Sequence, residues 1–154
     1  MSVIAAIRPD DWNYVLLLHI GGAMILVGGM LTAASALALA RGDVGVLRVG
    51  YGSLLLVCLP AYVLMRIGAE WLYTKEGYDD LPEDDSHPLW INIGFIVADA
   101  GLLALVIALV LGGIGVRRLR SGRGTGLLKA TMVVSIVLLA SFVVAVWAMS
   151  GKPD

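Results

Sequence analysis

The chain has 154 residues, of which 59% are hydrophobic and 15% are charged, and its formal net charge is −1. Soluble domains carry a charge on about a quarter of their residues, so this composition argues against a soluble globular protein. At this length we expect one domain, which covers residues 1–154.

The apolar residues are concentrated in four long blocks, at residues 12–40, 46–73, 90–116 and 126–149. Each block is longer than the roughly 20 residues that a helix needs to cross the hydrocarbon core of a membrane. The blocks lack the alternation of polar and apolar residues that is typical of barrel strands. The sequence therefore predicts an all-α polytopic membrane protein, a four-helix bundle with up-down topology because the connections are short.

The first block combines a histidine with a strip of small residues. His19 lies about 10 Å inward from Trp12 if the block is one helix. Small residues allow another helix to approach closely, and we expect this strip to pack within the chain, with a dimer contact as the alternative. The strip consists of Gly21, Gly22, Gly28, Gly29, Ala33 and Ala36.

The second block carries two opposite charges one helical turn apart, Arg66 and Glu70, in the segment VLMRIGAEWLY. Arg66 lies about 10 Å inward from the end of the block, and Tyr62 lies one turn before it on the same face. Pro60 cannot donate a hydrogen bond to the carbonyl four residues earlier. It therefore predicts either a kink that widens the bundle or an ordinary proline bend.

The connection between the second and third blocks, KEGYDDLPEDDSHP, holds six carboxylates and one lysine. Asp84, Asp85 and His87 are weak candidates for a metal site, although the segment lacks the spacing of a calcium-binding loop, and a solvated acidic turn is the alternative. In the third block, Asp99 lies about 13 Å inward from Trp90.

The basic residues predict the orientation in a bacterial inner membrane. Cytoplasmic connections are enriched in lysine and arginine, and seven basic residues flank the first and third connections. We therefore expect these two connections in the cytoplasm, and the acidic connection and both termini outside. The seven residues are Arg41, Arg48, Arg117, Arg118, Arg120, Arg123 and Lys129.

Three blocks contribute an ionisable group at nearly the same depth. A charge in mid-membrane costs about 2.5–3.5 kcal/mol on insertion scales, so we expect these groups to face one another rather than lipid. Arg66 is then predicted to pair with Asp99 and Glu70. The predicted pocket consists of His19, Tyr62, Arg66, Glu70 and Asp99, with Tyr14, Trp71, Phe95 and Trp147 as the nearby aromatic residues.

Ionisable residues in a membrane commonly mark a functional site. We expect the pocket to bind or move a small ion, a proton or an amphiphile, in a protein with no hydrolytic or nucleotide-using chemistry. One alternative is a redox protein that binds haem or a quinone, and another is a structural subunit whose ion pair fixes helix packing. The expected partners are membrane lipids and either a second copy or a larger membrane complex, and no nucleic acid.

The segment YVLLLHIGGAMILVGGML resembles the first helix of small bacterial membrane proteins related to the copper-resistance D family. The corresponding residues are Leu18, His19, Ala23, Gly28 and Gly29. The resemblance implies that His19 is a ligand of a metal or of haem b. Because His87 lies in a connection, a bis-histidine haem would need His19 from two copies, and a thioether is the other source of a second ligand. The candidate thioethers are Met24, Met30, Met65 and Met149.

Overall fold

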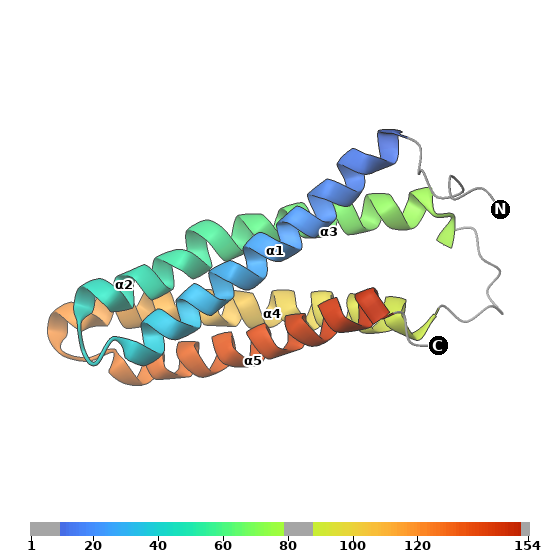
Figure 1. Cartoon of the computed structure of the whole chain (residues 1–154). Coiled ribbons are helices and arrows are strands. Elements are labelled where there is room, and N and C mark those ends of the chain that lie inside the picture. The colour runs from blue at the N-terminus through green and yellow to red at the C-terminus, as the bar shows by residue number, and fades with distance from the viewer. Residues whose placement is uncertain (1–9, 79–87, 152–154) are drawn as a thin grey trace.

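The computed structural model describes residues 10–78 and 88–151, with side chains from residue 14 onward apart from that of residue 120. Its elements are α1 (Asp10–Leu39), α2 (Val44–Ser53), the π-helical turn η1 (Leu54–Cys58), α3 (Leu59–Lys75), α4 (Leu89–Arg118), the 3₁₀ turn η3 (Leu119–Ser121) and α5 (Thr125–Gly151). They form an all-α bundle of four long rods (Figure 1), because α2, η1 and α3 follow one another as a single rod.

All four rods are long and apolar enough to cross a membrane. Their bounds lie within about two residues of the predicted ones, which confirms the prediction of four long apolar helices. At one end of the bundle α1 and α4 begin, and the last residues of α3 and α5 lie there too (Figure 1). We call it the terminal end. The short connections from α1 to α2 and from α4 to α5 lie at the opposite end, as the up-down topology predicts.

Local residue chemistry explains these two short connections. The carboxylate of Asp43 accepts hydrogen bonds from the backbone N–H groups of Gly45 and Val46, at 2.7 and 3.1 Å, and so caps the start of α2. Gly122 has a φ of 71°, in the left-handed region that glycine adopts without strain. It terminates η3 and lets the chain turn toward α5.

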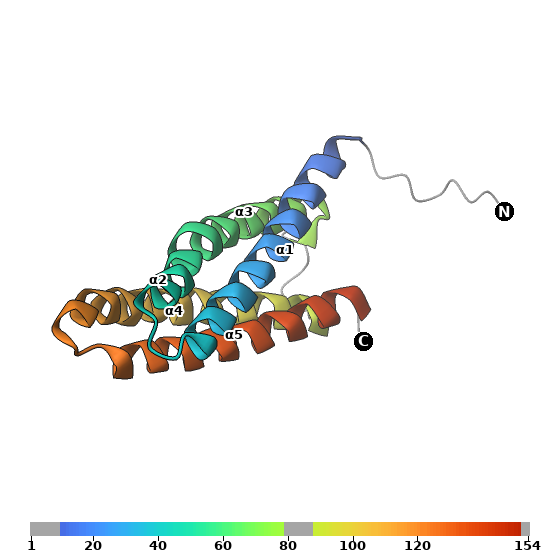
Figure 2. The same ribbon diagram turned by 60° about the vertical axis from the view of Figure 1, so that its left-hand side comes forward.

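The predicted effect of Pro60 is visible as a π-helical turn. The backbone N–H of Leu59 donates to the carbonyl of Leu54, five residues earlier, instead of the usual four. The wider turn accommodates the missing N–H of Pro60 and the steric conflict of its ring with the preceding turn. The rod changes direction between α2 and α3 (Figure 2).

The core lies at mid-length of the rods and is apolar. α1 packs against α3, α4 packs against α5, and α1 also packs on α5. Two buried hydroxyls of α5 bond within their own helix, Thr131 to the carbonyl of Leu127 and Ser135 to that of Thr131. The buried core residues include Leu26, Met30, Leu54, Cys58, Leu105, Leu138 and Phe142.

Glycines bring the backbones of α1 and α3 into direct contact. A Cβ atom added to Gly22 would lie 2.6 Å from the backbone nitrogen of Met65, and one added to Gly68 would lie 2.6 Å from that of His19. Any side chain at these two positions would push the helices apart. The predicted packing of the small-residue strip is thus confirmed at Gly22, whereas Gly21 and Gly28 face open space.

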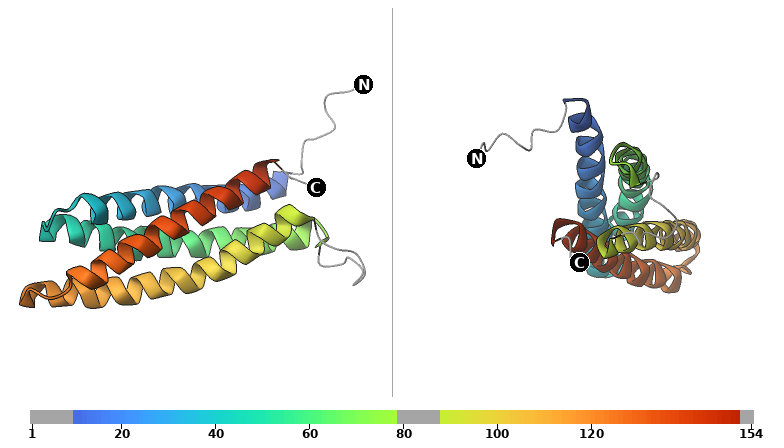
Figure 3. Two further views of the ribbon diagram at one scale, coloured as in Figure 1. Left: turned by 90° about the horizontal axis from the view of Figure 1, so that it is seen from below. Right: turned by 90° about the vertical axis from the view of Figure 1, so that its right-hand side faces the viewer.

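The tight contact with α3 separates α1 from α5 toward the terminal end. In the end-on view of Figure 3, the start of α1 lies beside α3 and well away from the end of α5. Toward the opposite end, α1 returns to α5, where Leu37, Ala40, Leu47 and Leu128 form a second buried cluster. The bundle is therefore packed at mid-length and at the opposite end, and it opens at the terminal end.

Candidate functional site

The predicted ion pairs of Arg66 are present. Its Nη2 atom lies 2.8 Å from Oε1 of Glu70 and 3.2 Å from Oδ1 of Asp99. The pair with Glu70 lies within α3, and the pair with Asp99 joins α3 to α4. The sequence-based estimate of depth therefore placed these two helices in the right register.

The carboxylates of this cluster do not face the interior of the bundle, contrary to expectation. The side chain of Arg66 is 27% exposed, but those of Glu70 and Asp99 are 51% and 67% exposed. The guanidinium of Arg66 lies over the ring of Phe95, with its carbon 4.9 Å from the ring centroid. The guanidinium therefore contacts the ring of Phe95 as well as two carboxylates that are largely exposed.

Tyr62 connects the same two helices further inward. Its side chain is buried, and its hydroxyl donates a hydrogen bond of 3.1 Å to the backbone carbonyl of Ala98. α3 and α4 otherwise make few contacts. We call the line of Tyr62, Arg66, Glu70, Phe95 and Asp99 the α3–α4 seam, and its contacts hold the two halves of the bundle together near the terminal end.

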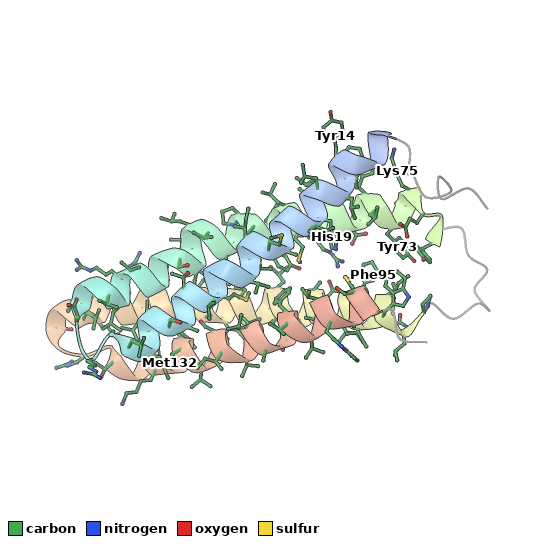
Figure 4. The ribbon with its side chains drawn as sticks, in the orientation of Figure 1. Tyr14, His19, Tyr73, Lys75, Phe95 and Met132 are labelled. Atoms are coloured by element: carbon green, nitrogen blue, oxygen red, sulfur yellow. The ribbon has the colours of Figure 1, made fainter. Side chains whose placement is uncertain are left out.

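His19 forms a hydrogen bond with the backbone of α3 rather than with a side chain of the α3–α4 seam. Its Nδ1 atom is 3.1 Å from the backbone carbonyl of Met65. Because a carbonyl can only accept, Nδ1 carries the hydrogen and donates it, and in the neutral ring Nε2 then holds a lone pair. Within the described residues no group bonds to Nε2. Figure 4 shows the ring pointing from α1 toward the space above α4 and α5.

This space is a groove of about 680 Å³ at the terminal end. It lies where α1 and α5 separate, and most of its surface is apolar. The side chains and backbone that line it are Leu16, His19, Ile20, Ala23, Met24, Val27 and Gly28 from α1, Ala69, Leu72 and Tyr73 from α3, Glu76 and Tyr78 after α3, Trp90, Ile91 and Phe95 from α4, and Val146, Met149 and Ser150 from α5.

A smaller cavity of about 60 Å³ shares His19, Phe95 and Met149 with the groove and is also lined by Arg66. Met149 reaches this region by packing directly over Gly94, where a Cβ atom would collide with its terminal methyl group. Arg66 and Phe95 therefore belong to the α3–α4 seam and also line this cavity.

Four aromatic rings form a continuous cluster in the wall of the groove near its terminal end. Tyr73 stacks on Tyr78 with a centroid distance of 5.7 Å and meets Phe95 edge to face at 5.3 Å. Tyr78 meets Trp90 edge to face at 6.2 Å. Figure 4 shows Tyr73 and Phe95 on the facing sides of α3 and α4.

The structure thus divides the five predicted pocket residues into two groups. His19 lines the groove and shares the smaller cavity with Arg66, whereas Tyr62, Glu70 and Asp99 line neither space. Among the predicted aromatic residues, Phe95 lines both the groove and the smaller cavity. Tyr14, Trp71 and Trp147 are exposed on the surface. That Tyr73, Glu76 and Tyr78 line the groove was not predictable from the sequence, because it depends on the tilt of α1.

The described residues contain no group of three or more His, Cys, Asp or Glu side chains close enough to share a metal ion. The loop candidates Asp84, Asp85 and His87 lie outside the described residues. Of the candidate thioethers, Met24 and Met149 line the groove together with His19, whereas Met30 is buried in the core.

Comparisons of the chain with protein-family models, with curated proteins and with solved structures give no match. The geometry of the groove and of the α3–α4 seam is therefore the basis for assigning a function.

The α3–α4 seam generates a prediction about stability. Arg66→Leu is expected to lower the free energy of unfolding by about 2 kcal/mol, because it leaves two neighbouring carboxylates without a counter-charge. Combining it with Glu70→Gln and Asp99→Asn is expected to recover most of that loss. Unfolding by SDS titration, followed by circular dichroism, measures both. A triple variant no more stable than Arg66→Leu would show that the three groups do not act as a unit.

Proposed function

We propose that the protein binds an amphiphilic small molecule in the groove between α1 and α5. The observation that supports this most directly is the position of His19: its Nδ1 is bonded to the carbonyl of Met65, and its Nε2 is left as a hydrogen-bond acceptor in a largely apolar wall. An unpaired polar atom in such a wall is favourable when a ligand supplies the partner.

The dimensions of the groove suit this proposal. Small-molecule sites commonly measure about 300–1,000 Å³ and are mostly apolar, with a few polar groups that orient the ligand. The groove has about 680 Å³. Its aromatic cluster lies toward the terminal end, and Val27 and Gly28 lie at its inner end, so an elongated molecule would run parallel to the helices.

The proposal places the groove in the outer leaflet of a bacterial inner membrane. The basic residues at the opposite end support a cytoplasmic location for that end, so the terminal end would face outward. Trp71 and Trp147 are exposed near the terminal end, where tryptophans favour the membrane–water interface. An amphiphile could then enter the groove directly from the lipid.

Binding is better supported than passage through the bundle. Beyond the inner end of the groove, the core is closed by fully buried side chains such as Leu54 and Leu105. The hydroxyls of Thr131 and Ser135 are bonded within α5. Either a second copy or a larger membrane complex would be needed to provide a polar path.

The open space at Gly28 allows a direct test. Gly28→Leu is expected to place a side chain in the groove and to reduce binding of a long-chain alcohol about tenfold. Gly21→Leu is the matched control, because Gly21 also faces open space but does not line the groove. Binding is measured by photo-crosslinking of dodecanol with a mid-chain diazirine in nonionic micelles, with the labelled residues identified by mass spectrometry.

The same assay tests His19. His19→Leu is expected to weaken binding about fivefold, the effect of one hydrogen bond, and His19→Gln, which keeps an acceptor, is expected to recover part of it. Labelling that is spread evenly over the lipid-facing surface, or equal effects of Gly28→Leu and Gly21→Leu, would contradict the proposal.

A second candidate function, haem binding, is favoured by one observation. Histidines that bind a metal through one ring nitrogen commonly donate the other N–H to a carbonyl, as His19 does to Met65. Met149 lines the same groove and would offer a thioether. If this function is correct, protein purified from haem-supplied cells is expected to show a Soret band that His19→Leu abolishes. A colourless protein with normal helical content would exclude this candidate.

A further inference from the structure

We infer that the opposite end of the bundle binds the headgroup of an anionic phospholipid where α2 and α4 meet. This site is separate from the groove, so the inference would stand even if the groove bound no ligand. It does use the proposed placement of the opposite end at the inner surface of the membrane.

The opposite end carries an unbalanced positive charge. Its six described basic side chains are all exposed: Arg41, Arg48, Arg117, Arg118, Arg123 and Lys129. None of them forms an ion pair within the described residues. Asp43 is the one acidic residue described at this end, and its carboxylate caps the start of α2. Figure 4 shows side-chain nitrogen atoms gathered at this end. The surface therefore attracts anions.

Tyr51 joins α2 to α4 at this end. A Cβ atom added to Gly112 would lie 2.7 Å from Cδ2 of Tyr51, and one added to Gly113 would lie 3.0 Å from its hydroxyl oxygen. The two glycines therefore let the ring pack directly against α4. No group in the described part of the chain bonds to the Tyr51 hydroxyl, and the side chain is only partly buried. This hydroxyl can therefore donate to a ligand.

Two of the arginines lie beside this contact. Arg48 precedes Tyr51 by three residues on α2, and Arg117 follows Gly113 by four residues on α4. Residues three or four apart share a face of a helix, and α2 begins at the end where α4 finishes. Both arginines therefore lie about one turn beyond the contact, toward the membrane surface. We call Arg48, Tyr51 and Arg117 the α2–α4 edge. Two guanidinium groups and a hydroxyl are donors that suit a phosphate group.

The surface next to the α2–α4 edge favours a lipid over a soluble anion. Leu55 follows Tyr51 by four residues on the same rod, and Val110 precedes Gly113 by three residues on α4; both side chains are exposed. In the proposed placement these two side chains contact acyl chains. A phospholipid would place its phosphate at the arginines and its chains along Leu55 and Val110. Basic sites between membrane helices bind anionic lipid headgroups in this way.

The test measures lipid binding to the purified protein by native mass spectrometry in a nonionic detergent. The lipids are phosphatidylglycerol, which is anionic, and phosphatidylcholine with the same chains, which is zwitterionic. We expect phosphatidylglycerol to bind at about tenfold lower concentration than phosphatidylcholine. Arg48→Gln combined with Arg117→Gln is expected to remove most of this preference. Tyr51→Phe is expected to weaken binding of phosphatidylglycerol about threefold, the effect of one hydrogen bond.

Arg123→Gln combined with Lys129→Gln is the matched control. It removes the same charge from the same end, but from the connection before α5 and from α5 itself, and the preference for phosphatidylglycerol is expected to persist. Circular dichroism shows whether each variant keeps its helices. Arg48→Gln and Arg117→Gln are also measured singly, and each is expected to weaken binding of phosphatidylglycerol about threefold.

Three results would overturn the inference. Equal losses in the two double variants would show a general attraction to the positive end rather than a site at the α2–α4 edge. Equal binding of the two lipids would show that the charge of the headgroup is not recognised. Displacement of phosphatidylglycerol by added inorganic phosphate would show a site for free anions.

Discussion

The close contact between α1 and α3 determines the rest of the arrangement. Gly22 and Gly68 remove the side chains that would keep the two helices apart, so the backbone of each helix lies against the other. The contact brings Nδ1 of His19 to the carbonyl of Met65. It also draws the start of α1 away from α5, and the space left between them is the groove. The close packing of α1 against α3 therefore creates the groove and also orients His19 within it.

The ionisable residues near the terminal end then divide into two roles. Arg66 and its two carboxylates join α3 to α4 at the surface of the bundle, where the partners lie within 3.2 Å of the guanidinium. His19 instead forms its hydrogen bond with the backbone carbonyl of Met65 and lines the groove. Charges at similar depth on different helices need not form one site, because each helix also has a rotation about its own axis that decides which neighbour its side chains meet.

The fold and part of the candidate site could be predicted from the sequence. Long apolar runs predict the four long helices to within about two residues, and helical rise alone predicts that Arg66 and Asp99 lie at one level. The exposure of the carboxylates was not predictable, because helices that are apolar on all sides give no periodic signal for their rotation. The groove was missed for a related reason. Its shape follows from the contact of Gly68 with α1, and a lone glycine in a membrane span does not indicate which helix it meets.

The most direct test of this account is the tautomer of His19 in the folded protein. In the variant His87→Gln, His19 is the one remaining histidine, and selective ¹⁵N labelling reports each ring nitrogen separately by NMR. At about pH 9, where an imidazole ring is neutral, the account predicts a hydrogen on Nδ1 and a bare Nε2. A hydrogen on Nε2 with a bare Nδ1 would contradict it, because the bond to Met65 would then be absent and the groove would lose its acceptor.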